Sequence, residues 1–475
     1  MLRDGISRGD IAQGNLGDCW LLSSCAAIAQ QPNLMGNVVS SEDQLLYGRD
    51  YKGVVHFRFW RFGEWVDVII DDSLPTLNSK LLYARGTDPN EFWVALLEKA
   101  YAKLHGSYSA IEGGQSMDAL VDLTGGLAER YELSDQNTSE IYHKLARAIG
   151  GGAFITCSRK GDWRSDDQQT DEMGLIAGHA YTITDVKRIK RLQGIENLIR
   201  VRNPWGMGEE WKGAWADKDS RWELVDEQTK KWLQYVDKED GEFWMSFKDF
   251  KREFQEVTIC TLGPDFNGDG TADKSRSILM VHGKWEVGKT AGGCRNDIPS
   301  FATNPQYLLT VYEPDEQDGS RLTEDPPENT CSVVVGLMQE YRRSRRHQGV
   351  KMLQIGFIIY ETSQPGHRLS KDHFMYNYEK AKSGTYVNFR EVCGRFDLEP
   401  GNYVIIPTTY SKNEEGTFLL RIYAPKEISV KMLPNVHEDK QTTPPRITDA
   451  NGQQRLSLGD DWDPEIIAAM KDVDD

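Results

Sequence analysis

The sequence predicts an α+β protein in which a core of two mixed lobes is followed by an antiparallel β-sandwich. The chain has 475 residues, enough for two to four domains. Helical and strand patterns alternate up to about residue 264, whereas only short β-like runs follow residue 276. Short strands separated by turn residues at regular intervals are typical of a sandwich.

The first lobe begins with a predicted helix at residues 19–30, which has an apolar face and ends before Pro32. Asp18 is a suitable N-cap, so Cys19 lies in the first turn. Residues 54–70 alternate as a hairpin with its turn at Gly63-Glu64. Residues 90–106 form an amphipathic pattern that ends at Gly106.

The β-rich runs "AFITCS", "HAYTITDV" and "LIRVRNPW" predict a second lobe that begins near Gly125-Gly126. Turn formers cluster at 262–275, and the runs "SVVVGLM", "IGFIIYE" and "TFLLRIYA" follow them. We therefore divide the chain into lobe 1 (1–125), lobe 2 (126–264), a connector (265–275), a sandwich (276–425) and an acidic tail (426–475).

Composition limits the functions that the chain can have. The net charge of −17 argues against a nucleic-acid partner and suits a protein that collects cations. Seven cysteines without repeated spacing indicate a reducing, intracellular setting, so we expect a cytoplasmic protein. We see neither a leader peptide nor an apolar run of membrane-spanning length.

Cys19 stands where a reactive thiol would be expected. The thiolate is the nucleophilic form of cysteine, and a helix N-terminus lowers the pKa of a thiol. His179 opens the strand "HAYTIT", and Asn203 ends "RVRNPWG" 24 residues later. Pairing of these strands would bring the Asn203 amide oxygen beside the imidazole, under the cover of Trp205. Gln13 precedes the Cys19 helix, and its amide can join the Cys19 N–H as an oxyanion hole.

Each of these residues has an ordinary structural explanation when taken alone. A cysteine in an apolar helix is usually part of the core, a strand histidine is usually structural, and Asn-Pro is most often a turn. The order Gln, Cys-Trp, Gly-His, Asn-Pro-Trp favours catalysis because every element fits one mechanism. Cys25 lies on another face of the helix, and we interpret it as a packing residue.

The stretches "GDCWLLSS", "GHAYTIT", "RVRNPWG" and "DGEFWMSFKDF" together resemble the core of calpains, the calcium-dependent papain-like cysteine proteases. "TAGGCRN" and "PGNYVIIPTTY" resemble the C2-like sandwich that follows that core. The resemblance covers roughly residues 1–425 and implies a papain-like two-lobed fold. It makes Cys19 the nucleophile, His179 the general base and acid, Asn203 the orienting residue and Gln13 the oxyanion glutamine. It also implies substrate contacts at Gly114, Gly178 and Trp205.

The resemblance further implies two calcium sites in the core, which draw the lobes into register. The first site would use the carboxylates of Asp10 and Glu91 and the carbonyls of Arg3 and Gly5. The second site would use the carboxylates of Glu210, Asp217, Asp240 and Glu242 and the carbonyl of Lys238. Oxygen ligands of this kind suit Ca²⁺. Surface acids on an acidic chain are the alternative explanation. The spacing after "NPWG" is one residue longer than in the family, so Glu209 can replace Glu210.

Two other charged regions remain open to more than one interpretation. "DFNGDGTADKSR" (265–276) has acids at EF-hand positions but Arg276 at position 12, and we interpret it as the connector. The acidic segment 313–328 and the basic segment 342–347 either take part in calcium response and acidic-phospholipid contact, as proposed in the family, or are solvated loops that pair with each other.

We expect a calcium-dependent intracellular cysteine endopeptidase that performs limited cleavage of protein substrates. Compared with the family, the start of the core and the penta-EF-hand domain are missing, so small-subunit binding is not expected. The alternative is a truncated, non-catalytic regulator that binds calcium or phospholipid. Acyl transfer of the transglutaminase type ranks last, since its third residue is normally Asp rather than Asn203.

Overall fold

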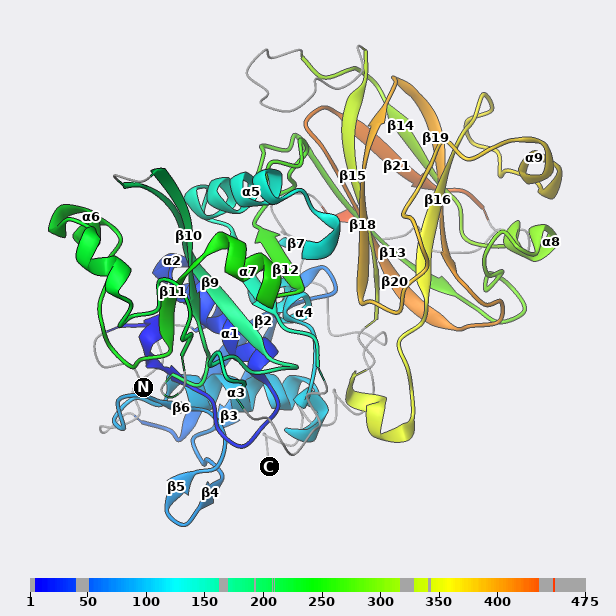
Figure 1. The fold of residues 1–475 in the computed structure, drawn as a ribbon. Coiled ribbons are helices and arrows are strands. Elements are labelled where there is room, and N and C mark those ends of the chain that lie inside the picture. Colours follow the sequence, from blue (N-terminus) through cyan, green and yellow to red (C-terminus); the bar gives the residue numbers. More distant parts are fainter. Residues whose placement is uncertain are drawn as a thin grey trace.

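A computed structural model describes residues 5–39, 51–161, 170–191, 194–206, 208, 210–316, 329–340, 343–434 and the short strand at 447–448. Helices and sheets occur in the first part of the chain and two packed sheets in the last, which confirms the α+β prediction (Figure 1). In these residues, no helix is both long and apolar enough to cross a membrane.

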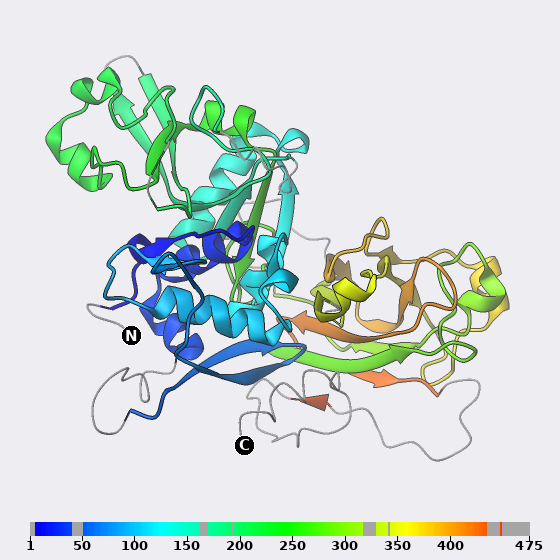
Figure 2. The ribbon, with the colours of Figure 1, turned by 90° about the horizontal axis from the view of Figure 1, so that it is seen from below.

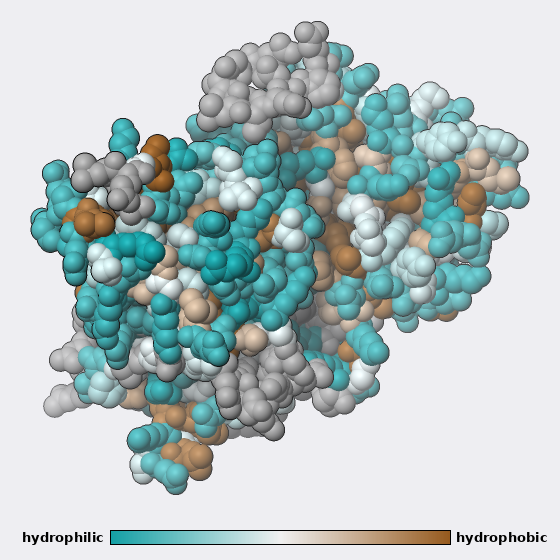
Figure 3. Space-filling view, viewed as in Figure 1, coloured by the Kyte–Doolittle hydropathy of each residue, from teal (hydrophilic) through white to brown (hydrophobic). Residues whose placement is uncertain are grey.

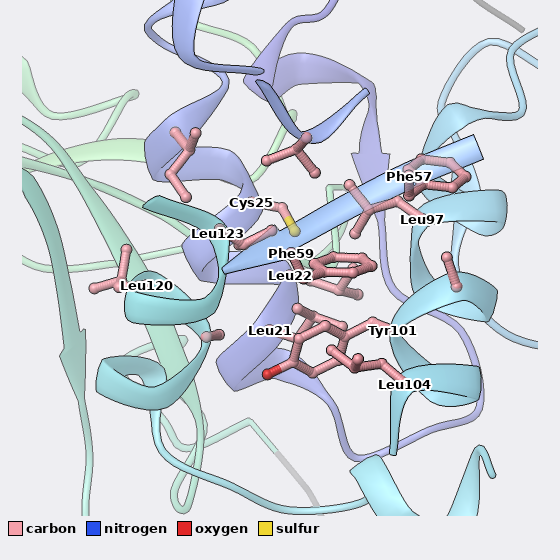
Figure 4. Packing of buried hydrophobic residues seen from close by; sticks show 14 of the residues in the cluster. Leu21, Leu22, Cys25, Phe57, Phe59, Leu97, Tyr101, Leu104, Leu120 and Leu123 are labelled. Atoms are coloured by element: carbon pink, nitrogen blue, oxygen red, sulfur yellow. The ribbon is translucent and has the colours of Figure 1, made fainter. Parts of the chain in front are cut away.

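Lobe 1 is built around helix α1 (Cys19–Ile28), all of whose residues are buried. Side chains from α1, the hairpin strand β2, and helices α3 and α4 meet there, and Cys25 lies among them (Figure 4). The remaining elements of the lobe are η1 (Arg8–Asp10), β1 (Ile11–Ala12), α2 (Pro32–Val38), β2 (Val54–Arg61), β3 (Glu64–Asp71), β4 (Thr76–Leu77), β5 (Lys80–Leu81), β6 (Arg85–Gly86), α3 (Trp93–Leu104), η2 (Ser109–Ile111) and α4 (Ser116–Thr124).

Two predicted details of lobe 1 need correction. Helix α1 ends at Ile28, and Pro32 does not close it but opens α2 as the first helical residue, where a missing N–H costs nothing. The hairpin turn is Phe62-Gly63, one residue earlier than predicted, because both residues have the positive φ that a two-residue turn requires.

Lobe 2 is an antiparallel sheet in the order β11-β10-β9-β8-β12-β7, with helices packed against it. The long hairpin of β9 and β10 carries the segments that begin at His179 and end at Asn203. The elements are β7 (Leu127–Glu132), η3 (Leu133–Asp135), α5 (Thr138–Gly150), β8 (Phe154–Ser158), β9 (Ala180–Arg191), β10 (Gly194–Arg202), η4 (Ser220–Leu224), α6 (Glu227–Trp232), β11 (Glu242–Ser246), α7 (Phe247–Glu253) and β12 (Glu256–Thr261).

The last part of the chain is a sandwich of two antiparallel sheets, β18-β15-β20-β13-β22 and β17-β16-β19-β14-β21. Apolar side chains from both inner faces form its core. Its elements are β13 (Ser277–Trp285), α8 (Ile298–Phe301), β14 (Tyr307–Val311), β15 (Cys331–Gln339), η5 (Arg343–Gln348), β16 (Ile355–Glu361), α9 (Lys371–Tyr376), β17 (Ala381–Lys382), β18 (Glu391–Leu398), β19 (Gly401–Thr409), β20 (Gly416–Ala424), β21 (Ile428–Met432) and β22 (Ile447–Thr448).

The sandwich is joined to lobe 1 by a shared core and by buried arginines. Met338 and Leu419 belong to the lobe 1 core, and the β2–β3 hairpin runs beside β13 (Figure 2). Arg421, which is fully buried, pairs with Glu391 at 2.5 Å and donates to the carbonyl of Gly125 in lobe 1 at 3.2 Å. The face seen in Figure 3 is mostly hydrophilic.

Candidate active site

The two lobes meet along helix α1 and strand β9. The Thr182 hydroxyl of β9 donates to the carbonyl of Ser23 in α1 at 2.7 Å. The backbone N–H of Gln13 donates to the carbonyl of Pro204 at 3.0 Å. These bonds bring the segment before Cys19 next to the segment that follows β10, so the candidate site lies on both lobes.

His179 and Asn203 form the predicted hydrogen bond, with 2.9 Å between Nε2 and Oδ1. The same Oδ1 accepts the backbone N–H of Trp205, so it serves as an acceptor and Nε2 carries the proton. Nδ1 of His179 is buried without a hydrogen-bond partner and is the nitrogen left to accept a proton. The Trp205 ring lies edge-on to the imidazole at 5.4 Å, which agrees with the predicted cover.

Cys19 starts α1, and its sulfur lies close enough to the backbone N–H of Ala180 for that group to lower the thiol pKa. Burial acts in the other direction and more strongly, and it raises the pKa of Cys19 to about 11. Burial also lowers the pKa of His179 to about 4. The backbone N–H groups of Cys19 and Trp20 at the start of the helix also lower the thiol pKa, as expected, but burial outweighs them and the net shift is upward.

Asp18 occupies the N-cap position of α1, as predicted, but its side chain does not cap the helix. Asp18 makes no side-chain cap bond, because its carboxyl faces Glu98 of α3 in the interior. Burial raises the pKa of Asp18 to about 7 and that of Glu98 well above its ordinary value, since two buried carboxyls disfavour a second charge. The Glu98 carboxyl accepts the backbone N–H of Ala84 at 3.1 Å. Sequence reasoning gave no role to Glu98, because α3 meets Asp18 only in the tertiary structure.

The other predicted site residues lie around this centre. Gln13 is buried, its Nε2 donates to the carbonyl of Leu16 at 2.7 Å, and its Oε1 has no partner. Gly114 is exposed on the loop before α4, and Gly178, with φ of 65°, directly precedes His179. Since each amide nitrogen has two protons, Gln13 retains one donor for a further acceptor.

The first predicted calcium set is only partly described. Arg3 lies outside the described residues. Asp10 accepts the N–H of Ser7 at 2.7 Å and Nε1 of Trp93 at 3.2 Å, and the β1–β6 ladder places it beside the segment that leads to Glu91. Glu91 is only 3% exposed, whereas a glutamate that merely lies on the surface is rarely buried to this extent. Gly5 has φ of 106° and is exposed.

Most of the second set converges on two facing loops. Glu210 accepts the N–H of Gly241 at 2.7 Å, and Asp217 accepts the N–H of Lys238 at 3.2 Å. Glu210, Asp217 and Lys238 line a cavity of about 690 Å³. Burial, together with the neighbouring acids, raises the pKa of both Glu210 and Asp217 to about 7. Asp240 belongs to this acidic group because its charge helps to raise both values.

Glu242 is directed elsewhere, since it pairs with Arg8 at 3.1 Å and with Arg200 at 3.5 Å. Glu209, the alternative to Glu210, lies outside the described residues. Within the part of the chain that the structure describes, no three His, Cys, Asp or Glu side chains converge closely enough to hold a metal ion. The Glu210 and Asp217 carboxylates nevertheless line one cavity, and oxygen ligands of this kind suit a hard cation.

The connector and the basic segment have specific contacts. Asp265 accepts the N–H of Gly270 at 2.7 Å and lies 3.3 Å from Arg395, so the 265–276 loop is tied to the sandwich by an arginine. The acidic segment lies mostly outside the described residues. Arg343 and Arg346 of the basic segment donate to lobe 1 carbonyls, a contact that sequence reasoning did not foresee.

Comparisons with known proteins agree on one protein family. The family model described as calpain family cysteine protease matches residues 1–261, and the model described as calpain large subunit, domain III, matches residues 281–423. Calpain-A of Drosophila melanogaster is 43% identical over 431 residues, which cover 89% of this chain and 51% of that protein. Calpain-B of the same organism is 41% identical over 432 residues, with coverage of 89% and 45%.

The calpain-1 catalytic subunit of Homo sapiens is 43% identical over 435 residues, which cover 89% of this chain and 58% of that protein. The chain thus spans roughly half the length of these relatives, between 45% and 58%. A clostridial cysteine protease structure aligns over 94% of the chain at 10% identity, but its TM-score of 0.22 supports no argument.

Proposed function

Because the chain belongs to the calpain family of cysteine proteases, we propose that it is a calcium-dependent endopeptidase that makes limited cuts in protein substrates. One observation carries the proposal. The imidazole of His179 donates through Nε2 to Asn203, while its buried Nδ1 has no partner, and Cys19 lies beside the next residue of β9. A thiol, a free imidazole nitrogen and an orienting amide are the parts that a cysteine protease needs.

In the proposed reaction, Nδ1 of His179 takes the proton of the Cys19 thiol as the sulfur attacks the scissile carbonyl carbon. The resulting oxyanion accepts hydrogen bonds from the free Gln13 amide proton and the Cys19 N–H. The C–N bond breaks as His179 protonates the leaving amine, which leaves a thioester. Water then attacks the thioester and gives its proton to His179, and the sulfur leaves and recovers the proton.

Substrate would bind as an extended strand along Gly114 and Gly178, mainly through backbone hydrogen bonds. Such recognition depends on an accessible extended segment rather than on one side chain, so cleavage is limited and weakly sequence-specific. Acidic-phospholipid binding by the sandwich stays a prediction.

The calcium dependence rests on two properties of the chain. Burial raises the pKa of the Cys19 thiol and lowers that of His179, so a change that brings positive charge or solvent to the site would favour the thiolate. Glu210, Asp217, Asp240 and the Lys238 carbonyl would hold one ion, and Asp10, Glu91 and Gly5 would contribute to another. Bound Ca²⁺ would supply positive charge that draws these oxygen-bearing loops together.

The test is hydrolysis of casein and of a fluorogenic peptide by the whole chain, with calcium and with excess chelator. We expect hydrolysis in calcium only, and none by Cys19→Ser. The matched control Cys393→Ser, in the sandwich, should cleave like the parent. Cleavage by folded Cys19→Ser would refute the assignment. Failure of an epoxysuccinyl thiol inhibitor to label the folded parent, with or without calcium, would favour the non-catalytic alternative.

A further inference from the structure

Arginines of the sandwich hold the lobe 1 loop that leads to Gly114. We call residues 110–114 the glycine loop. Arg343, the first residue of η5, donates from Nη1 to the carbonyl of Ala110 at 2.9 Å and to that of Gly113 at 2.6 Å. Arg346 donates to the carbonyl of Glu112 at 2.7 Å. Three carbonyls of this loop are therefore satisfied by another domain, through charge-assisted bonds.

Arg343 also connects the glycine loop to the segment that carries Cys19. Its guanidinium lies over the Trp20 ring, 4.7 Å from the centroid. The indole of Trp20 donates to the carbonyl of Ile111 at 3.0 Å. The N–H of Gly113 donates to the carbonyl of Gly17 at 2.7 Å. The loop, the first turn of α1 and Arg343 are thus one packed unit.

The packing around Gly114 shows on which side this unit supports the loop. A Cβ at Gly114 would overlap the Trp20 ring and would lie 2.6 Å from Nη2 of Arg343. Trp20 is buried, whereas Gly114 itself is exposed. Arg343 and Trp20 therefore back the loop from inside and leave its outer edge open to a bound chain.

We propose that Arg343 is a positioning residue for substrate binding, which fixes the Gly113–Gly114 backbone in the shape that pairs with an extended peptide. The inference rests on the proposed protease function of the same site. It makes the sandwich part of the substrate-binding apparatus, because the loop keeps its shape only while η5 is docked. Arg343 does not touch the reacting atoms, so its loss changes binding of an extended substrate more than the chemistry at Cys19.

The test compares Arg343→Ala, Arg343→Lys and the control Arg368→Ala in the whole chain. Arg368 likewise donates to two backbone carbonyls, those of Ala302 and Asn304, but within the sandwich. The readouts are kcat and KM for an extended fluorogenic peptide, and hydrogen–deuterium exchange of the peptide that covers residues 109–116. Circular dichroism and thermal unfolding establish that each variant is folded.

We expect Arg343→Ala to raise KM by about ten-fold with kcat changed less than about three-fold, because charge-assisted bonds to the loop are lost. Exchange in residues 109–116 should accelerate, Arg343→Lys should recover part of both effects, and Arg368→Ala should change neither. If Arg343→Ala is unstable, the same comparison is made with Arg343→Lys alone.

Unchanged exchange in the glycine loop, or an unchanged KM, would overturn the inference. An equal fall of kcat in Arg343→Ala and Arg368→Ala would do so too, because it would indicate a general loss of structure. A parent chain without peptidase activity would refute the proposed function instead. In that case the exchange result decides whether Arg343 holds the loop.

Discussion

The protonation state of the Cys19–His179 pair is set by burial on both sides of the candidate site. Cys19 is 8% exposed and His179 is 1% exposed, so neither charged form is well solvated. The pKa of the thiol rises to about 11 while that of the imidazole falls to about 4. In this arrangement the neutral pair is favoured over the ion pair at every pH between these two values.

We predict that alkylation of Cys19 by iodoacetamide without calcium becomes faster as pH rises towards about 11. The thiolate is the reacting form, so at pH 8 the rate should be roughly 100-fold below that of a free thiol with an ordinary pKa. Mass spectrometry of the Cys19 peptide measures the rate across pH 6–11. A rate that reaches its plateau below pH 8 would show that the thiol is already ionised near neutrality.

The Asp18–Glu98 pair predicts a pH dependence of stability. The pKa of Asp18 is about 7 in the folded chain against 3.8 for the ordinary group, so the folded state holds a proton that the unfolded state loses. Stability therefore falls as pH rises from about 4 to about 7. Asp18→Asn cannot ionise, so relative to the parent it should gain on the order of 1–4 kcal/mol at pH 8 compared with pH 4.

Urea unfolding of the parent and Asp18→Asn at both pH values measures this difference. Asp372→Asn is the control, since Asp372 is an exposed residue of helix α9. The buried-pair explanation fails if the effect of Asp18→Asn on the free energy of unfolding is the same at pH 4 and pH 8.

At the scale of elements, the sequence pattern correctly predicted the helices and strands that are determined by residues close to one another in the chain. The helix at Cys19, the hairpin after residue 54 and the strands that carry His179 and Asn203 are all present, because hydrophobic period and turn residues define them. The errors occurred where two local interpretations competed. Pro32 fits both a helix end and a helix start, and Gly63 fits either position of a two-residue turn.

Gly125 connects the elements of lobe 1 to those of lobe 2, and its geometry gives an element-scale prediction. It ends α4 with φ of 71°, and a Cβ there would lie 2.9 Å from the Trp60 ring. Gly125→Ala should therefore destabilise the chain by about 1–3 kcal/mol, through left-handed strain and overpacking.

Gly150, the last residue of α5, is the matched control for this prediction. A Cβ at that position meets nothing within 4 Å, so Gly150→Ala should be neutral or stabilising by about 0.5 kcal/mol. Chemical denaturation of both variants measures the two effects. Equal stability of Gly125→Ala and the parent would show that the α4 end can relax away from Trp60.

At the scale of the whole molecule, sequence reasoning found the residues of the site but not what supports them. Antiparallel pairing of β9 with β10 made the His179–Asn203 contact predictable from their positions at the hairpin ends. Arg343 could not be assigned in this way. Its partners lie more than 200 residues earlier in the chain, and no spacing rule connects them. The basic segment 342–347 showed that positive charge was present, but not which residues that charge would contact.

The two acidic loops of lobe 2 that we propose as a calcium site give the prediction that involves the whole molecule, since the segments next to them reach lobe 1. Glu242 follows Gly241 and pairs with Arg8, and Arg202 of β10 donates to the carbonyl of Asp240 at 3.0 Å. An ion between Glu210, Asp217 and Asp240 would stabilise the folded chain by mass action, so we expect the unfolding temperature to rise with calcium concentration.

The double variant Glu210→Gln/Asp217→Asn should lose most of that rise. The control Asp226→Asn/Glu227→Gln makes the same change in charge on α6, away from the cavity lining, and should retain it. Because the pKa values of Glu210 and Asp217 are about 7, protons compete with the ion, and the calcium concentration for half the effect should increase from pH 8 to pH 6. A calcium response in the double variant equal to that of the parent would exclude these carboxylates as ligands.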